Sequence, residues 1–230
     1  MNPAQKTSVC AKCDGYGYIM KEDGAVACEC QDDIQALVRL RDARIPERFA
    51  SKQLETFEAR DKVRREVKRT ALSYVQAFNL KNRLQRLGIM LEGPVGCGKT
   101  HIAVGILKGV IAKGYTGLYY NIAELFKDIR ATFDEESELI EDDILERVAG
   151  VELLVLDDLG AEHATPFVLD RLYLMINRRY EDCLPLIVTT NCDWETLTRR
   201  LSERITSRLT EMCNKFVPFP EEDYRRKNLR

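Results

Sequence analysis

The stretch Gly93-Pro-Val-Gly-Cys-Gly-Lys-Thr100 decides the fold that this sequence predicts. It matches the pattern G-x-x-x-x-G-K-[ST] at each fixed position. Its glycines allow the backbone to wrap a polyphosphate with amide groups pointing inward, and the helix expected from Lys99 adds its positive N-terminal end. A short buried strand, 88–92, precedes the motif. This context predicts an ATP-binding phosphate loop rather than a glycine-rich turn without a ligand.

The predicted nucleotide-binding residues continue into the first turn of that helix. They are Gly93, Pro94, Val95, Gly96, Cys97, Gly98, Lys99, Thr100 and His101. In such a loop, the lysine reaches the β and γ oxygens and the hydroxyl of Thr100 binds Mg²⁺. Lys99 is therefore also a candidate catalytic residue, whereas we interpret His101 as a helix residue rather than a catalyst.

A second magnesium anchor is expected at the end of a neighbouring buried strand. The run Leu153-Leu-Val-Leu-Asp157-Asp158 places two carboxylates after an apolar segment. We expect Asp157 to hold Mg²⁺ and Asp158 to polarise the attacking water, although strand-end capping is the alternative for such a pair. Asn191 ends another apolar run, 186–190, where it could orient the water or sense the γ-phosphate. It could instead cap the next helix, a role for which Asp193 competes.

Strands and helices alternate along the rest of the chain. The expected helices are 31–44, 58–80, 99–112, 122–134, 138–149, 166–181 and 194–213, and the expected strands are 88–92, 117–120, 151–157, 186–190 and 215–217. Such alternation is typical of a parallel sheet covered by helices on both faces, which makes a three-layer α/β sandwich.

Length and composition agree with one α/β domain and a small appendage. The chain has 230 residues, of which 45% are hydrophobic and 31% charged. No apolar run is long enough to cross a bilayer and the N-terminus lacks a secretory h-region, so we expect a cytoplasmic protein without a membrane partner. A net charge of −2 leaves any DNA binding to local basic patches.

Four of the eight cysteines lie close together near the N-terminus. They form the pairs Cys10-x-x-Cys13 and Cys28-x-Cys30. Paired thiolates with glycines between them suit tetrahedral Zn²⁺, and so short a hairpin cannot fold on its own core. Redox disulfides are the alternative. We expect residues 1–44 to form a zinc-binding module with an amphipathic helix, followed by a nucleotide-binding domain over 45–230.

The ordered set of motifs resembles the AAA+ ATPases of the DnaC/DnaI helicase-loader and IstB transposition-helper group. The resemblance covers roughly residues 44–225. It rests on Ile45-Pro-Glu-Arg-Phe49, the phosphate loop, Leu153 to Gly160, Ile176-Asn-Arg-Arg-Tyr180, Thr189-Thr-Asn191 and Glu203-Arg-Ile-Thr-Ser-Arg-Leu209. It implies an AAA+ ATPase that hydrolyses ATP. Because the chain ends soon after Pro220, it also implies a C-terminal lid that is reduced or absent.

The resemblance assigns further roles. It implies that Arg208, with Arg204 one turn earlier, is an arginine finger for the ATP of a neighbouring subunit, although both could belong to a solvated basic face. Arg225 falls where these proteins carry a second arginine sensor, an assignment that a missing lid puts in doubt. Contacts with single-stranded DNA are implied for Lys127, Arg130, Phe133, Thr165 and Phe167.

The function implied by the resemblance is that of a DNA-replication ATPase. Such a protein would load a replicative helicase by oligomerising on ATP, binding single-stranded DNA and remodelling the hexameric helicase. One alternative is an IstB-like transposition helper that binds duplex DNA and a transposase; the N-terminal cysteine module favours the loader. The other is a nucleotide-gated adaptor with little turnover.

Overall fold

The computed structural model describes residues 10–14, 16–21, 23–81, 88–134, 140–161 and 165–219. Its central sheet is parallel, and the order of its strands is β4–β5–β6–β3–β7. The strands are β3 (Gly88–Glu92), β4 (Gly117–Asn121), β5 (Leu153–Asp157), β6 (Leu186–Thr190) and β7 (Cys213–Pro218). Strand β6 therefore separates the strand that leads into the phosphate loop from the strand that ends at Asp157.

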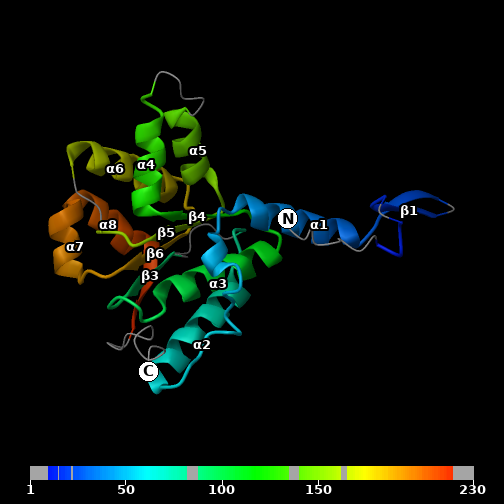
Figure 1. The fold of residues 1–230 in the computed structure, drawn as a ribbon, viewed down its shortest axis with the longest axis horizontal. Helices are drawn as coiled ribbons and strands as arrows, with labels where there is room; N and C mark the ends of the chain where they lie inside the picture. Colours follow the sequence, from blue (N-terminus) through cyan, green and yellow to red (C-terminus); the bar gives the residue numbers. More distant parts are fainter. Residues whose placement is uncertain are drawn as a thin grey trace, which may run out of the picture.

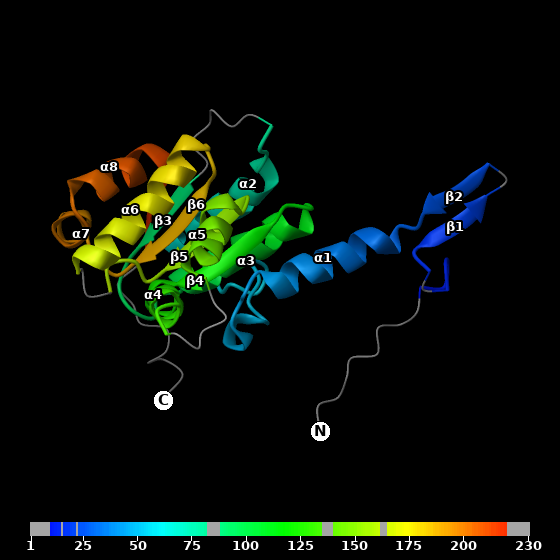
Figure 2. The same cartoon turned by 90° about the horizontal axis from the view of Figure 1, so that it is seen from above.

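Helices cover both faces of this sheet, as the sequence predicts (Figures 1 and 2). The helices of the main body are α2 (Lys62–Ala77), α3 (Lys99–Ala112), α4 (Ile122–Ala131), α5 (Glu141–Gly150), α6 (Pro166–Glu181), α7 (Trp194–Leu201) and α8 (Glu203–Met212). One core joins α2, α3 and the segment 43–59 to the sheet, and the other joins α4 to α8. Alternate strand residues divide between them: Leu153 and Val155 face the first core, and Leu154 and Leu156 the second.

The N-terminal segment forms an arm that projects from the body (Figures 1 and 2). Strands β1 (Tyr18–Lys21) and β2 (Gly24–Ala27) make an antiparallel hairpin, and α1 (Cys30–Asp42) connects it to the body. Ala43, at the end of α1, is fully buried, and its carbonyl accepts a hydrogen bond from Tyr119 N at 2.8 Å. The arm is therefore anchored at its α1 end to the edge strand β4.

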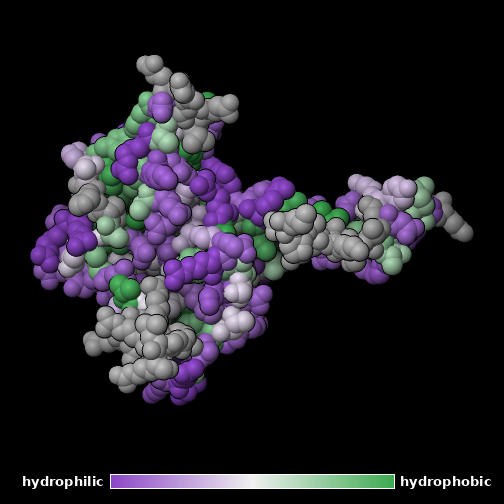
Figure 3. Space-filling model, in the orientation of Figure 1, coloured by the Kyte–Doolittle hydropathy of each residue, from purple (hydrophilic) through white to green (hydrophobic). Residues whose placement is uncertain are grey.

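Apolar side chains are exposed along this arm (Figure 3). Ile34, Leu37 and Val38 form the apolar face that periodicity predicts for α1, and Tyr18 and Met20 are exposed on the hairpin. Among the described helices, none has the length and apolar character needed to span a bilayer.

Several expected helices differ by a few residues from those observed, and two of the differences have a clear physical cause. Helix α2 begins at Lys62 rather than near residue 58, because the Asp61 carboxylate caps it by accepting a hydrogen bond from Arg64 N at 2.7 Å. The expected helix 194–213 is divided into α7 and α8 at Ser202, whose φ of 82° lies outside the helical region. The break gives α8, which carries Arg204 and Arg208, a direction of its own.

The buried side chain of Arg179 links the segment that precedes β5 to the segment that precedes β6. Its side chain is fully buried and donates hydrogen bonds to the carbonyl oxygens of Val148, Ala149, Val151 and Pro185 at 2.6–3.1 Å. These carbonyls lie at the end of α5 and before β6. The second arginine of the Ile176-Asn-Arg-Arg-Tyr180 motif is therefore a structural residue, unlike Asn177 and Tyr180, which are considered below.

Candidate functional site

The predicted phosphate loop connects β3 to the N-terminus of α3. Gly93, Gly96 and Gly98 have φ angles of 154°, 79° and 109°, a region that side chains disfavour. A Cβ on Gly98 would lie 2.9 Å from the Phe57 ring, and one on Gly93 would lie 2.8 Å from Phe219 Cβ. The glycines are thus required both by the backbone turn and by the close approach of two aromatic side chains.

Lys99 lies inside the loop with its ammonium group surrounded by acceptors. Only 5% of the residue is exposed. Its Nζ donates to the carbonyl oxygens of Gly93 and Pro94 at 2.8 and 2.9 Å, and to Asn191 Oδ1 at 2.7 Å. A bound phosphate would meet a cation that is already desolvated and held at the centre of the loop.

The carboxylate of Asp157 lies beside the loop and accepts hydrogen bonds from three hydroxyl groups. Thr100 Oγ1 and Thr189 Oγ1 donate to Asp157 Oδ1 at 2.9 and 2.7 Å, and Tyr119 OH donates to Oδ2 at 2.7 Å. Burial, together with the charge of Asp157, raises the pKa of Tyr119. Both candidate Mg²⁺ ligands, Thr100 and Asp157, are therefore in contact. Sequence reasoning missed Tyr119 and the role of Thr189.

Asp158 and Asn191 complete this group. Asp158 adopts a left-handed φ of 61°, and its Oδ1 accepts a hydrogen bond from Asn191 Nδ2 at 3.3 Å. Asn191 thus bridges Lys99 and Asp158. The cap of α7 is Asp193, whose carboxylate accepts a hydrogen bond from Thr196 N at 2.7 Å. The alternative of Asn191 as the helix cap is therefore wrong, because Asp193 occupies that position.

A pocket of about 540 Å³ lies over these groups. The loop residues 95–101, Asp158 and Asn191 line one part of it. Residues 48–64, which come before β3 and include the start of α2, supply the rest, among them the basic residues Arg48, Lys52 and Arg64 together with Phe57. Sequence reasoning did not select these residues, although Arg48 lies within the motif Ile45-Pro-Glu-Arg-Phe49.

His101 connects α3 to that same segment. Its Nε2 lies 2.7 Å from the Gln53 carbonyl oxygen and 3.3 Å from Thr56 Oγ1, and its ring packs edge-on against Phe57. Burial lowers the pKa of His101. These contacts fit a helix residue that secures the wall of the pocket.

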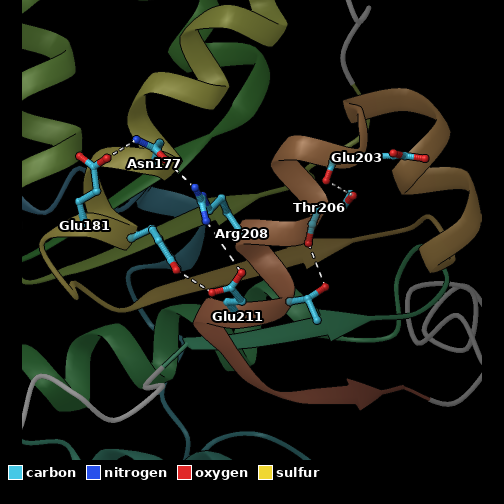
Figure 4. A network of polar contacts seen from close by, with 8 residues as sticks. Asn177, Glu181, Glu203, Thr206, Arg208 and Glu211 are labelled. Carbon is cyan, nitrogen blue, oxygen red and sulfur yellow. Dashed lines mark hydrogen bonds and ion pairs between the residues drawn. The ribbon is translucent and has the colours of Figure 1, made fainter.

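Arg208 and Arg204 both lie on α8, and neither lines the pocket. Arg208 Nε donates to Asn177 Oδ1 at 3.2 Å (Figure 4). Its guanidinium lies over the Tyr180 ring. Arg204 is exposed. Arg225, the third predicted arginine, lies outside the described residues, as does the rest of the segment 220–230 where a lid would begin.

The candidate DNA residues lie at the end of α4 and the start of α6. Phe133 is 59% exposed, and its ring contacts that of Phe167 edge-on, with centroids 5.7 Å apart. Lys127 and Arg130 are exposed on α4. Thr165 is the N-cap of α6, with Oγ1 accepting from Val168 N at 3.3 Å. The fold thus brings together two aromatic residues that are far apart in sequence.

The four N-terminal cysteines converge at the base of the hairpin. All four sulfur atoms lie within 4.8 Å of one another, with Cys10–Cys28 at 3.8 Å and Cys13–Cys30 at 3.4 Å. Tetrahedral Zn²⁺ with Zn–S bonds of about 2.3 Å would separate its sulfur ligands by about 3.8 Å. Gly17 N also donates a hydrogen bond to Cys13 Sγ at 3.3 Å. The cluster therefore fits a zinc module.

Most of this chain, including the nucleotide site, matches one known protein family. The model of the IstB-like ATP binding proteins matches residues 28–230, which include α1 and all of the main body. The chain belongs to the IstB-like ATP binding protein family. This confirms the resemblance drawn from the motifs.

Several relatives of this chain are named as replicative helicase loaders. The replicative helicase loader DnaC of Escherichia coli (strain K12) is 26% identical over 136 residues, which are 59% of this chain and 55% of DnaC. The uncharacterized protein YdaV of the same organism is 28% identical over 165 residues, or 71% of this chain and 65% of YdaV. The chain therefore spans little more than half the length of the first of these relatives.

Solved structures share the fold of this IstB-like chain. The crystal structure of the DnaC helicase loader has a TM-score of 0.68 and 26% identity, and it covers 76% of this chain and 100% of that one. The DnaI crystal structure gives 0.65 with 22% identity over 78% and 94% of the two chains. The fold is thus the AAA+ fold of these proteins, with a parallel sheet between helical layers.

Proposed function

We propose that this protein is an ATP-hydrolysing DNA-replication factor that loads a replicative helicase. The observation that carries the proposal is the meeting of Lys99, Asp158 and Asn191 at one pocket, in a chain similar to DnaC. On this proposal the protein oligomerises on ATP, binds single-stranded DNA and remodels a hexameric helicase. Residues 45–230 are its ATPase domain and residues 1–44 its zinc-binding module.

The chemistry of hydrolysis needs phosphate stabilisation and an oriented water molecule. Lys99 and the amides of the loop would stabilise the phosphates, and Asp158 would polarise the water. Asn191, which already contacts both residues, would report the γ-phosphate to Asp158. Thr100 and Asp157 would hold Mg²⁺, which neutralises charge on the β and γ phosphates.

We expect Tyr119→Phe to raise the Mg²⁺ concentration for half-maximal hydrolysis about tenfold. The variant removes the hydroxyl that donates to Asp157 Oδ2, and loss of a group that orients a metal ligand costs about 10–100-fold in metal affinity. Tyr120→Phe is the matched control, because its hydroxyl lies 3.3 Å from Asp128 instead. If Tyr119→Phe and wild type needed the same Mg²⁺ concentration for half-maximal ATPase rate, Tyr119 would not orient Asp157 as a Mg²⁺ ligand.

A structural Zn²⁺ in the cysteine cluster is the second part of the proposal. We expect one zinc per chain by elemental analysis of protein purified without chelator, and loss of it in Cys28→Ser. Cys183→Ser is the control, since Cys183 is exposed and lies on the body. Chelation should unfold the hairpin but leave the body folded, because the body has two cores of its own. Zinc near zero in reduced, folded protein would refute the site.

The DNA surface is proposed at the contact of Phe133 with Phe167. Bases of a single strand could stack on the exposed Phe133, while Lys127 and Arg130 meet the backbone. Thr165 lies beside Phe167 and would support the same surface.

The experiment that tests the function measures binding of single-stranded and duplex DNA with ATP present, and helicase loading in the same samples. We expect a preference for the single strand, and about tenfold weaker binding by Phe133→Ala because one stacked base contributes about 1–3 kcal/mol. Leu174→Ala is the control, as an exposed apolar residue elsewhere on α6. Tighter binding to duplex DNA, unaffected by Phe133→Ala, would contradict the loader.

A transposition helper is the second candidate function, and the family match to IstB-like proteins is the observation that favours it. Such a protein would bind duplex DNA and recruit a transposase, so the DNA comparison above separates the two. A nucleotide-gated adaptor would show ATP binding with negligible turnover whether or not DNA is present.

A further inference from the structure

The side chain of Arg208 contacts three residues on α6 and α8, of which Asn177 and Glu211 are labelled in Figure 4. Asn177 Oδ1 accepts a hydrogen bond from Nε at 3.2 Å, and the guanidinium carbon lies 4.1 Å from the centre of the Tyr180 ring. Glu211, one turn further along α8, accepts a hydrogen bond from Tyr180 OH at 2.7 Å. We call Asn177, Tyr180 and Glu211 the arginine platform.

The platform is itself oriented by a further contact. Asn177 Nδ2 donates to Glu181 Oε1 at 2.8 Å. Because a carboxylate accepts only from the NH₂ side of an amide, this bond turns the amide oxygen of Asn177 toward Arg208. The acceptor that holds Arg208 is therefore set by a neighbour on the same helix.

The platform engages Nε and one flat face of the guanidinium through Asn177 and Tyr180. On the other edge, Nη1 makes only a long ion pair with Glu211 Oε1 at 3.9 Å, beyond hydrogen-bonding distance, which a phosphate could replace. Nη2 makes no hydrogen bond to any residue that the structure describes, and 32% of the side chain is exposed. The two Nη groups form the fork that binds phosphate oxygens in bidentate geometry.

We propose that the arginine platform positions Arg208 for the ATP of a neighbouring subunit before the subunits meet. This inference rests on the proposed ATP-dependent oligomer and on the role in trans that the family resemblance implies for Arg208. An unrestrained arginine would lose about 2 kcal/mol of rotamer entropy on entering the neighbouring site. A platform that selects one orientation in advance reduces that loss, and misplacement by about 1 Å can lower a rate about 100-fold. Asn177 and Tyr180 are thus positioning residues.

The hydrogen bonds of the platform are expected to contribute little to the stability of the fold. Asn177 and Tyr180 are only partly buried, and partly exposed polar contacts of this kind contribute about 0–1 kcal/mol to stability. If the platform only stabilised the fold, its removal would change thermal unfolding slightly. It would not change how well one subunit supplies Arg208 to the ATP site of its neighbour.

The test measures how well one protein supplies its arginine to another. Arg208→Ala protein keeps an intact phosphate loop, and Lys99→Ala protein keeps an intact arginine. In a mixture, hydrolysis occurs only where Lys99→Ala protein supplies Arg208 to an Arg208→Ala neighbour. Second substitutions in the Lys99→Ala protein then change only the supplied arginine.

We expect Asn177→Ala and Tyr180→Leu, each added to Lys99→Ala, to lower the recovered hydrolysis rate about tenfold. Tyr180→Phe keeps the ring face and should recover most of the rate. Arg178→Ala, an exposed neighbour on α6, should have no effect. Thermal unfolding of each variant checks the fold, and Asn177→Ala decides the result if Tyr180→Leu does not fold.

Two outcomes would overturn the inference and are distinguishable. Equal recovery with and without the platform substitutions would refute the positioning role while leaving the finger in trans intact. No recovery with Lys99→Ala alone would refute the finger itself, and the platform with it.

Discussion

Lys99→Ala is expected to lower ATP hydrolysis about 1,000-fold and ATP affinity about 100-fold. The side chain is 5% exposed and lies at the centre of the phosphate loop, close to the carbonyls of Gly93 and Pro94. Removing it deletes charge-assisted contacts worth about 1.5–3 kcal/mol each in the bound state. Loss of one donor to the developing charge costs a further 10²–10³-fold or so in rate. Steady-state hydrolysis and titration with a fluorescent ATP analogue measure the two effects.

Asp158→Asn is the matched comparison for Lys99→Ala. It preserves the size of the side chain and the contact with Asn191, but removes the charge that would polarise water. We expect hydrolysis to fall while ATP affinity stays near that of wild type. A Lys99→Ala protein that hydrolyses ATP like wild type would refute the nucleotide site as proposed.

Arg208→Ala is expected to bind ATP normally and to lose nearly all hydrolysis. The pocket and the contact between Thr100 and Asp157 are untouched, because Arg208 does not line the pocket of its own chain. An arginine supplied in trans contributes about 10³–10⁵-fold to hydrolysis in related chemistry. ATP binding by calorimetry and hydrolysis as a function of protein concentration measure the separation.

Mixing Arg208→Ala with Lys99→Ala protein should restore activity. With random assembly at equal amounts, about a quarter of the subunit boundaries pair an intact loop with an intact arginine, so we expect about a quarter of the wild-type rate. Arg204→Ala provides a comparison one turn away on α8 and should retain more activity. A monomer with full activity, and no recovery at any mixing ratio, would contradict the finger in trans.

Local sequence patterns were sufficient for the parts of the protein whose residues are contiguous. The phosphate loop requires glycines at set spacings, so Gly93 to Thr100 identifies it directly. The apolar run before Asp157 predicts a buried strand, and the carboxyl ends of parallel strands meet at one edge. The approach of Asp157 to Thr100 follows from that rule. The spacing of the four cysteines likewise predicts their cluster, because two close pairs joined by a hairpin must converge.

Groups from segments distant in sequence could not be found in this way. Tyr119 resembles any apolar strand residue until the pairing of β4 with β5 brings its hydroxyl to Asp157. Arg48 and Lys52 lie more than forty residues before the phosphate loop, yet they line the pocket because this segment packs over α3. No periodicity encodes such contacts, since they depend on which elements become neighbours.

The sequence by itself determined the three-layer fold, the residues of the phosphate loop and the clustering of the four N-terminal cysteines, since each depends on local periodicity or spacing. Only the tertiary structure decided the surroundings of Arg208. A helix pattern continues through 194–213, but the backbone of Ser202 breaks it and redirects α8 toward α6. Tyr180 and Asn177 then meet an arginine about thirty residues away. Side-chain contacts at that separation depend on the packing of two helices, and packing is a property of the whole chain.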